Sequence, residues 1–174
     1  MINMNIDVFT LIKPEMNKLR KVGIKSANLD CRLLLSKSLD TDKTLYNHQN
    51  INISENEIKN FQSLVEQRLN GKPISRIINK REFWKHEFKL NEETLDPRPD
   101  SETLIDSVLE HYKNKSKSLK ILDLGSGSGC LGLSLLDEYQ NSEVSFFDTS
   151  KKSLEVVKMN AFNLGFLDRS KFVH

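Results

Sequence analysis

A short apolar segment that runs into closely spaced glycines constrains this chain more than any other feature. Residues 119–124 have the pattern of a buried strand and lead directly into Gly125-Ser126-Gly127-Ser128-Gly129, after which residues 128–139 have a helical pattern. Glycine tolerates positive φ and lets a ligand approach the backbone closely. A turn of this kind presents N–H groups at a helix start, where an anionic ligand group is favoured. The segment therefore predicts a nucleotide-binding loop.

The spacing of the glycines distinguishes between two kinds of nucleotide ligand. The dinucleotide fingerprint is G-x-G-x-x-G. Counted from Gly125, its last glycine would fall on Cys130, and the one formal match, from Gly127 to Gly132, is offset into the helix. Glycines placed directly after Asp123-Leu124 fit an S-adenosylmethionine loop better.

An acidic residue follows the next predicted strand, residues 144–147. This residue, Asp148, stands where a carboxylate accepts hydrogen bonds from the ribose hydroxyls of a bound nucleoside. The alternative is a helix N-cap, because Asp148-Thr149-Ser150 precedes a helical pattern. The joint occurrence of strand, glycine loop and acid favours the ribose role.

Strands and helices alternate through the C-terminal part of the chain. After the first strand and helix come the strand at 144–147, a helix at 151–164 and the opening of a third strand at 171–174. This order predicts an α/β fold with a parallel sheet and right-handed crossovers. Parallel sheets are covered on both faces. Three strands are too few for that, so we expect the front part of a longer protein.

The first 70 or so residues show helical periodicity instead. One apolar face consists of Phe9, Ile12, Met16 and Leu19, and Pro14 is expected to break or bend that helix.

Two further helices complete a predicted helical bundle. Ser26 is a candidate N-cap for a helix whose apolar face is Leu29, Leu33 and Leu34. Ser54 and Glu57 form a capping-box pattern, and Gly71 and Pro73 end the helix that it opens. Residues 81–95 are then rich in aromatics and predict a strand pair or hairpin, followed by a linker that Pro97 and Pro99 stiffen.

Several segments together narrow the assignment. They are Leu29-Asp30-Cys31-Arg32-Leu33-Leu34-Leu35, Arg68-Leu69-Asn70-Gly71-Lys72-Pro73-Ile74, Arg81-Glu82-Phe83-Trp84 and Leu95-Asp96-Pro97-Arg98-Pro99-Asp100-Ser101-Glu102. With the glycine loop at the expected distance, the chain resembles the PrmC/HemK family, methyltransferases that modify the glutamine of the Gly-Gly-Gln motif in peptide-chain release factors. Ser101 stands where the family's Pro-Arg-Pro-x-Thr-Glu segment has threonine. Asp96, Arg76 and Asn79 also depart from the family's usual residues.

The resemblance implies a domain order and a set of site residues. Residues 1–77 would be a helical substrate-recognition domain, 78–99 a hairpin linker, and 100–174 a partial S-adenosylmethionine-binding domain of the Rossmann-like class I type. A release factor would be the partner. Arg98 and Glu102 would lie near the active-site mouth, although they could equally pair with each other. The implied cofactor contacts are Gly125, Ser126, Gly127, Ser128, Gly129 and Asp148.

The family's catalytic Asn-Pro-Pro-Tyr motif, which follows the fourth strand, is absent from the 174 residues. No catalytic residue is therefore assigned, and we expect the isolated chain to be inactive. Two alternatives stay open. Adenine methyltransferases of nucleic acids can share the loop and an Asn-Pro-Pro motif, but the helical domain and the Pro-Arg-Pro segment argue against them. The chain could also be an inactive remnant that only binds cofactor or a partner.

Composition and residue spacing bear on the cellular location of the protein and on whether it binds a metal. The chain is 37% hydrophobic and 29% charged, with a formal net charge of +2, which is typical of a globular protein. No apolar run approaches the roughly 18 residues of a membrane span, and the N-terminus lacks a signal-peptide pattern, so we expect a cytoplasmic protein. Cys31, Cys130 and the scattered histidines have no metal-ligand spacing. We expect no metal, no membrane contact and no direct nucleic-acid binding.

Overall fold

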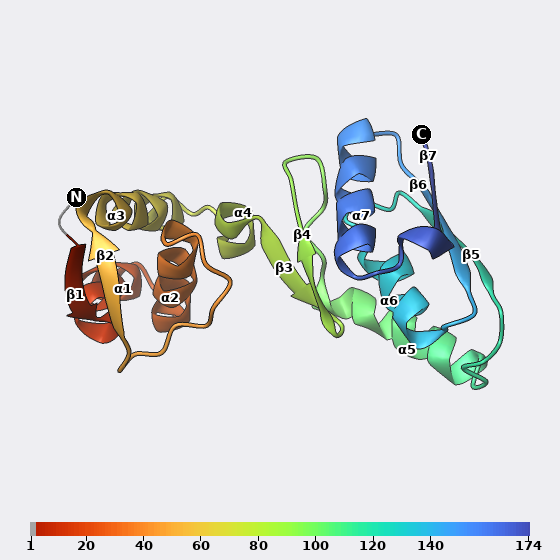
Figure 1. Ribbon diagram of the computed structural model, residues 1–174, viewed down its shortest axis with the longest axis horizontal. Coiled ribbons are helices and arrows are strands. Elements are labelled where there is room, and N and C mark those ends of the chain that lie inside the picture. The colour runs from red at the N-terminus through yellow and green to blue at the C-terminus, as the bar shows by residue number, and fades with distance from the viewer. Residues whose placement is uncertain (1–2) are drawn as a thin grey trace. The chain divides into compact units, whose positions relative to one another are not determined.

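The computed structural model describes residues 3–174, and the chain divides into two compact units, Met1–Ile78 and Asn79–His174 (Figure 1). Each unit encloses a buried apolar core of its own. A separate core is what allows a segment of chain to fold as a domain.

The first unit combines helices with a small sheet. In chain order its elements are β1 (Asn3–Asp7), α1 (Val8–Lys21), α2 (Ala27–Ser38), β2 (Asn50–Ser54), α3 (Glu55–Leu69) and α4 (Ile74–Ile78). β1 and β2 pair antiparallel, from Asn3 opposite Ser54 to Asp7 opposite Asn50. The structure thus adds two strands to the predicted bundle. Their signal was the alternation of asparagine with Ile51 and Ile53, both of which are buried.

Pro14 lies inside α1 instead of ending it, so the expected break is not found. An interior proline forgoes a backbone hydrogen bond and costs roughly 3 kcal/mol. The helix continues because Val8, Ile12, Met16 and Leu19 are all buried in the core of the unit. Burying side chains of this kind contributes about 1.5–3 kcal/mol each, which outweighs the proline.

The predicted caps and apolar faces of α2 and α3 are only partly found in the structure. The capping box at the start of α3 is confirmed, because the Ser54 hydroxyl accepts from Glu57 N–H and the Glu57 carboxylate accepts from Ser54 N–H. Ser26 does occupy the N-cap of α2, but its side chain makes no capping hydrogen bond. Leu29, predicted to be buried, is 50% exposed, and Cys31 and Leu35 fill the core instead.

An ion pair joins α2 to α3. Arg68 Nε donates to Asp30 Oδ2 at 2.7 Å, and Asp30 is almost fully buried. Arg68 also donates to the carbonyl of Lys72 at 3.2 Å. Two of the segments that carry the family resemblance therefore meet in space at this pair.

The second unit begins with a hairpin and continues as an α/β layer. Its elements are β3 (Lys80–Phe83), β4 (His86–Lys89), η1 (Pro99–Ser101), α5 (Glu102–His111), β5 (Lys120–Leu124), α6 (Cys130–Glu138), β6 (Glu143–Phe147), α7 (Lys151–Asn163), η2 (Leu167–Arg169) and β7 (Ser170–Val173). The last three strands form a parallel sheet in the order β5-β6-β7. The predicted α/β fold is confirmed, and this strand order is that of one half of a Rossmann-like sheet.

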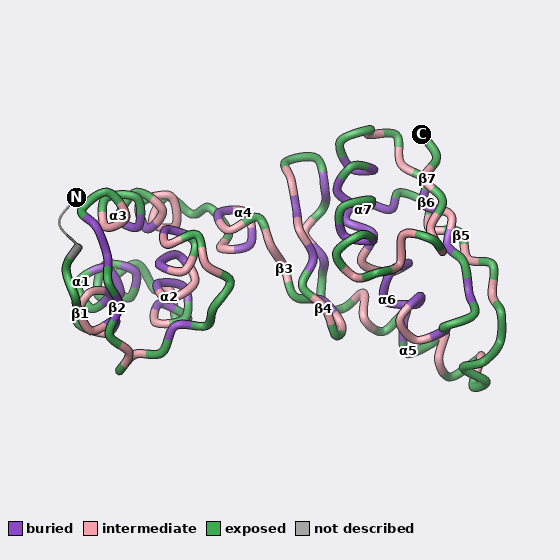
Figure 2. The backbone as a smooth tube through the Cα atoms, viewed as in Figure 1, coloured by how far each residue is buried: buried purple, intermediate pink, exposed green. Residues whose placement is uncertain are grey.

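The helices of this unit cover one face of the sheet. In Figure 1, α6 and α7 lie on the same side of β5, β6 and β7. Val144 and Phe146 of β6 are fully buried and belong to the apolar core of this unit. The other face is exposed: β5 and β7, coloured green and pink in Figure 2, contain no buried residue. It carries the exposed apolar side chains Leu122, Leu124, Phe147 and Val173.

The C-terminal end of α6 is held by an arginine from a distant segment. Arg169, in η2, donates to the carbonyls of Leu136 and Tyr139 at 3.0 Å each and to that of Ser142 at 3.3 Å. The last carbonyls of a helix lack partners within the helix. A guanidinium, with five fixed donors, suits this arrangement better than a lysine would.

We predict that Arg169→Met lowers the free energy of unfolding by about 2–4 kcal/mol, because several charge-assisted hydrogen bonds are lost and carbonyls are left without partners. Urea denaturation followed by circular dichroism measures the change. Lys158→Met, at an exposed position of α7, is the matched control and should shift stability by no more than about 0.5 kcal/mol. Equal effects of the two substitutions would contradict the capping role.

Candidate functional site

The glycine loop has the left-handed backbone that its sequence predicted. It connects β5 to α6, and Gly125, Gly127 and Gly129 have φ values of 70°, 54° and 77°. L-residues with side chains rarely adopt such values. A Cβ placed on Gly129 would lie 2.7 Å from Cγ1 of Val157, so this glycine is required by packing as well.

Gly132 has a different role from the loop glycines. It lies within α6, where a Cβ would lie 2.5 Å from the ring of Phe146 and 2.9 Å from Oδ2 of Asp123. Its absence of a side chain lets the helix pack closely on the sheet. The formal dinucleotide match that ends at Gly132 therefore ends on a residue used for helix–sheet packing.

The structure brings the glycine loop and Asp148 together. Asp148 follows β6, and its Oδ2 accepts a hydrogen bond from the N–H of Gly127 at 2.9 Å. Its Oδ1 accepts from the N–H of Ser150, also at 2.9 Å. A carboxylate has about four acceptor positions, so both oxygens can accept further donors. The N-cap of α7 is Ser150, which accepts from Ser153 N–H.

Most backbone N–H groups of the loop are used within the protein. The N–H groups of Gly125 and Ser126 both donate to the carbonyl of Phe147, and that of Gly129 donates to Ser126. At the start of α6, the N–H of Gly132 donates to Oδ2 of Asp123 at 3.1 Å. The prediction of an anion site at this helix start is therefore wrong in one respect, because the Asp123 carboxylate already accepts from the N–H of Gly132.

Burial raises the pKa of Asp123, and the nearby charge of Asp148 acts in the same direction, while the hydrogen bond from Gly132 opposes both. Two carboxyl groups thus flank the loop. Burial also raises the pKa of Cys130 to about 11, so its thiol is protonated at neutral pH and is not an activated nucleophile.

One loop side chain is buried without a partner. Ser126 is 7% exposed, and its Oγ has no hydrogen-bond partner among the described residues. Buried hydroxyl groups are normally hydrogen-bonded. Ser126 therefore has unused capacity to donate or accept at the loop.

Arg98 and Glu102, the predicted substrate contacts, lie at η1 and the start of α5. Oε1 of Glu102 accepts from the backbone N–H of Trp84 at 2.8 Å. Trp84 is in the turn between β3 and β4 with φ at 55°, a conformation that costs roughly 1–2 kcal/mol for an L-residue. Glu102 thus helps to hold the hairpin turn, whereas Arg98 is exposed.

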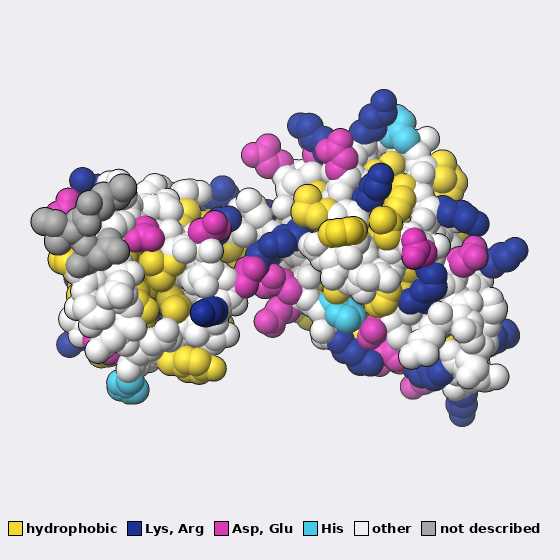
Figure 3. All heavy atoms as spheres, in the orientation of Figure 1, with side chains coloured by type: hydrophobic (Ala, Val, Ile, Leu, Met, Phe, Trp, Pro, Cys, Tyr) yellow, Lys and Arg dark blue, Asp and Glu magenta, His cyan; other side chains and the backbone are white. Residues whose placement is uncertain are grey.

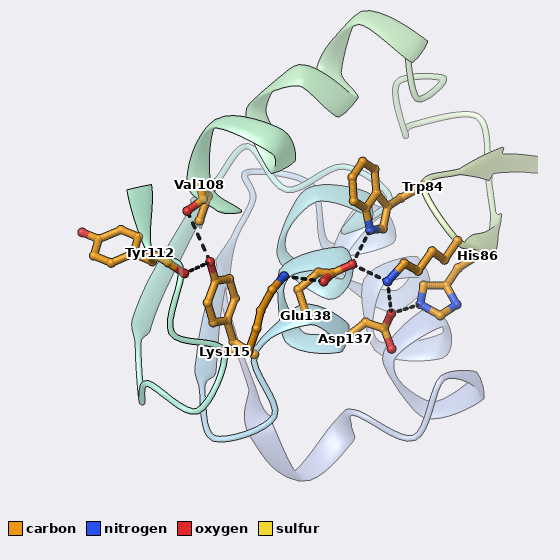
Figure 4. A network of polar contacts seen from close by, with 9 residues as sticks. Trp84, His86, Val108, Tyr112, Lys115, Asp137 and Glu138 are labelled. Atoms are coloured by element: carbon orange, nitrogen blue, oxygen red, sulfur yellow. Dashed lines mark hydrogen bonds and ion pairs between the residues drawn. The ribbon is translucent and has the colours of Figure 1, made fainter. Parts of the chain in front are cut away.

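A polar network anchors the same turn to the end of α6 (Figure 4). The indole N–H of Trp84 donates to Glu138 Oε1 at 2.9 Å, and Lys115 Nζ lies 2.6 Å from Glu138 Oε2. Lys85 also pairs with Glu138, and Nε2 of His86 lies 3.4 Å from Oδ2 of Asp137. Acids are unfavourable at a helix C-terminus, and the ammonium groups of Lys85 and Lys115 offset that cost.

Elsewhere the surface is mixed in charge. Acidic and basic side chains are interspersed on the face shown in Figure 3. Among the described residues, no cluster of histidine, cysteine, aspartate and glutamate could hold a metal ion. No helix in that part of the chain combines the length and apolarity needed to cross a bilayer.

Two protein-family models match the chain in succession. Residues 16–78 match the PrmC N-terminal domain, and residues 98–170 match the methyltransferase small domain. The two matches fall in the first and second structural units respectively.

Curated relatives match along nearly the whole chain. The release factor glutamine methyltransferase of Bradyrhizobium diazoefficiens is 36% identical over 159 residues, which cover 90% of this chain and 54% of that protein. The bifunctional methyltransferase of Rickettsia prowazekii is 34% identical over 189 residues, covering 98% of this chain and 36% of the relative. The chain thus spans about half or less of the relatives it matches. A solved methyltransferase from Geobacter sulfurreducens, in complex with S-adenosyl-L-homocysteine, is 27% identical with a TM-score of 0.37, covering 44% of this chain and 29% of that one.

The network at Glu138 predicts a pH-dependent contribution to stability. Burial raises the pKa of this carboxyl, but hydrogen bonds from Lys115, Lys85 and Trp84 outweigh it and lower the pKa from 4.5 to about 2. A lowered pKa stabilises the fold above the unfolded value, and that stabilisation disappears as the pH falls through the folded value. We predict that Glu138→Gln costs roughly 1–3 kcal/mol at pH 7.

The difference in unfolding free energy between wild type and Glu138→Gln should shrink as the pH is lowered from about 5 to about 2. Urea titrations at a series of pH values measure it. Glu143→Gln, at an exposed ion pair with Lys171, is the control and should show a difference below about 1 kcal/mol. A difference for Glu138→Gln that stays constant with pH would contradict the assignment.

Proposed function

The chain belongs to the PrmC family of methyltransferases, and from that premise we propose that it provides the cofactor-binding part of an S-adenosylmethionine-dependent enzyme that methylates the glutamine of the Gly-Gly-Gln motif in peptide-chain release factors. The observation that carries the proposal is the succession of a PrmC N-terminal domain and a methyltransferase small domain in one chain. The curated relatives named release factor glutamine methyltransferase support the same substrate.

The loop suits S-adenosylmethionine better than a dinucleotide. A pyrophosphate needs free N–H groups and a positive field at the helix start. Here Asp123 occupies that position at Gly132, and Phe147 accepts from Gly125 and Ser126. Two nearby carboxyl groups, those of Asp123 and Asp148, disfavour an anion and favour a ligand that carries ribose hydroxyls and positive charge.

Different residues of the loop would contact different groups of the cofactor. Asp148 has acceptor positions left for ribose hydroxyls, and the unpartnered Oγ of Ser126 can bond to a polar group. A Cβ on Gly125 would meet no atom within 4 Å, so the loop backbone is open on that side. When bound, S-adenosylmethionine supplies a methyl group activated by its positive sulfonium.

The accepting nitrogen of glutamine is a poor nucleophile, because its lone pair is delocalised into the carbonyl. Alignment with the methyl group is therefore the main requirement, and orientation can contribute roughly 7–11 kcal/mol. The Asn-Pro-Pro-Tyr motif that does this in the family is not among the 174 residues. We assign no catalytic residue. We propose that the 174-residue chain by itself binds the cofactor but does not transfer its methyl group.

We assign the first unit to recognition of the release factor, and Arg98 to contact with the substrate near the loop. Glu102 acts on the hairpin, because its carboxylate accepts from Trp84 N–H. Translation termination places this activity in the cytoplasm. On the face shown in Figure 3, basic side chains are interspersed with acidic ones and form no continuous basic patch that would support binding of nucleic acid.

The proposal is tested by isothermal titration of the chain with S-adenosylhomocysteine. We predict saturable binding by wild type and a loss of at least about 10-fold in affinity for Asp148→Asn, because an amide offers one acceptor oxygen in place of two. Asp168→Asn, in η2 and away from the loop, should bind as wild type does. Absence of binding by wild type would contradict cofactor binding.

A second measurement addresses the substrate. With tritiated S-adenosylmethionine, we expect no transfer to release factor by the 174-residue chain, and transfer by a longer protein that adds an Asn-Pro-Pro-Tyr segment. Transfer to RNA or DNA but not to release factor would contradict the proposed substrate.

A further inference from the structure

A buried asparagine links the hairpin to the glycine loop. Asn160 lies on α7 and is 2% exposed. Its Nδ2 donates to the carbonyl of Ser128 at 2.9 Å and to that of Lys89 at 3.1 Å, and its Oδ1 accepts from Lys89 N–H at 2.9 Å. All three bonds go to backbone groups, so they fix the course of the chain itself.

The bonds to Lys89 complete the outer edge of the hairpin. Lys89 is the last residue of β4 and pairs with Lys80 of β3 in the antiparallel register. The carboxamide of Asn160 donates to its carbonyl and accepts from its N–H, as the backbone of a neighbouring strand would. The hairpin is thereby fastened to α7 at its base, in addition to its attachment at the turn through Glu138.

The bond to Ser128 fixes one peptide of the glycine loop. The carbonyl of the Ser128–Gly129 peptide accepts from Asn160, and the N–H of the same peptide donates to Ser126 at 2.7 Å. Rotation of this peptide plane would break both bonds. Val157, one helical turn before Asn160, also closes the space beside Gly129. One face of α7 thus sets the shape of the loop.

We propose that Asn160 is a positioning residue for the cofactor loop, which it fastens to the β3–β4 hairpin through the backbones of Ser128 and Lys89. This role rests on the proposed binding of cofactor by the same loop. A loop held in its binding shape before the ligand arrives loses less entropy on binding. Because one carboxamide bonds to both segments, loss of the Asn160 side chain releases the hairpin base and the loop together.

The direct test is Asn160→Asp, measured in the 174-residue chain at pH 8. The substitution keeps an acceptor for Lys89 N–H but removes both donated bonds and places a carboxylate beside two carbonyls. We expect the Kd for S-adenosylhomocysteine to rise at least about 10-fold. We also expect amide hydrogen exchange to accelerate at Gly129 in this variant, and at both Gly129 and Lys89 in Asn160→Ala, which leaves no acceptor for Lys89 N–H. The amides shared by β5 and β6 should keep their protection.

Tyr139→Phe is the matched control. It removes a buried hydroxyl bonded to the carbonyl of Tyr112 at 2.7 Å, at the opposite end of α6 from the loop. The loss of a buried hydrogen bond lowers the melting temperature, yet we expect the Kd to change less than about 2-fold. Asn160→Ala, which buries no charge, replaces Asn160→Asp if that variant does not fold.

The outcomes separate the two levels of the proposal. If Asn160 variants melt at lower temperature but bind S-adenosylhomocysteine like wild type, with unchanged exchange at Gly129, Asn160 is merely structural and the inference is overturned. If wild type itself does not bind, the proposed function fails, and exchange at Gly129 and Lys89 still decides whether Asn160 holds both segments. In Asn160→Ala, faster exchange at only one of those two amides overturns the link between them.

Discussion

The hydrogen bond from Gly127 to the carboxylate of Asp148 is the interaction on which the site depends. It joins the segments that follow two neighbouring parallel strands, β5 and β6. The register sets Leu124 opposite Phe147, so the residues after each strand leave the sheet at the same edge. Ligands of open α/β sheets bind at this carboxyl edge. The bond therefore fixes the loop at the place where the fold can receive a ligand.

The rest of the loop is arranged so that the protein satisfies its own polar groups first. Phe147, Ser126 and Asp123 accept from loop and helix N–H groups that a phosphate would otherwise use. The positive end of α6 faces a carboxyl group of the protein. Both S-adenosylmethionine and a dinucleotide carry ribose hydroxyls, which Asp148 can bind. A site with carboxyl groups at the helix start distinguishes them by charge, because it favours the positive sulfonium and disfavours a pyrophosphate. The network at Glu138 and the carboxamide of Asn160 then hold the hairpin beside it.

The sequence predicted the parts of the structure that depend on local patterns. The alternation of strand patterns with helix patterns predicted the parallel sheet. The glycine spacing predicted the loop, because left-handed φ values have a strong residue preference. The capping box at Ser54 has a similarly local cause. The strand at Asn50–Ser54 also had a local sequence signal, the alternation of polar and apolar residues. That alternation was short and ended at Ser54, the first residue of the capping box.

Other features depend on tertiary contacts and left no signal in the sequence. Pro14 is tolerated because four buried side chains outweigh its cost. Glu138 and Asn160 look like ordinary helical residues, and their partners lie 54 and 71 residues away in the chain. The anion site expected at the helix start was wrong in one respect, because Asp123, nine residues before Gly132, accepts from the N–H of Gly132.

Backbone amide chemical shifts during titration with S-adenosylhomocysteine test the central claim most directly, because each N–H of the site reports separately. The structure predicts saturable shifts at Gly125 to Gly129 and at Ser150, with little change in α1 to α4 of the first unit. Shifts that are absent from the loop, or that are largest in the first unit, would contradict the assignment of the cofactor site.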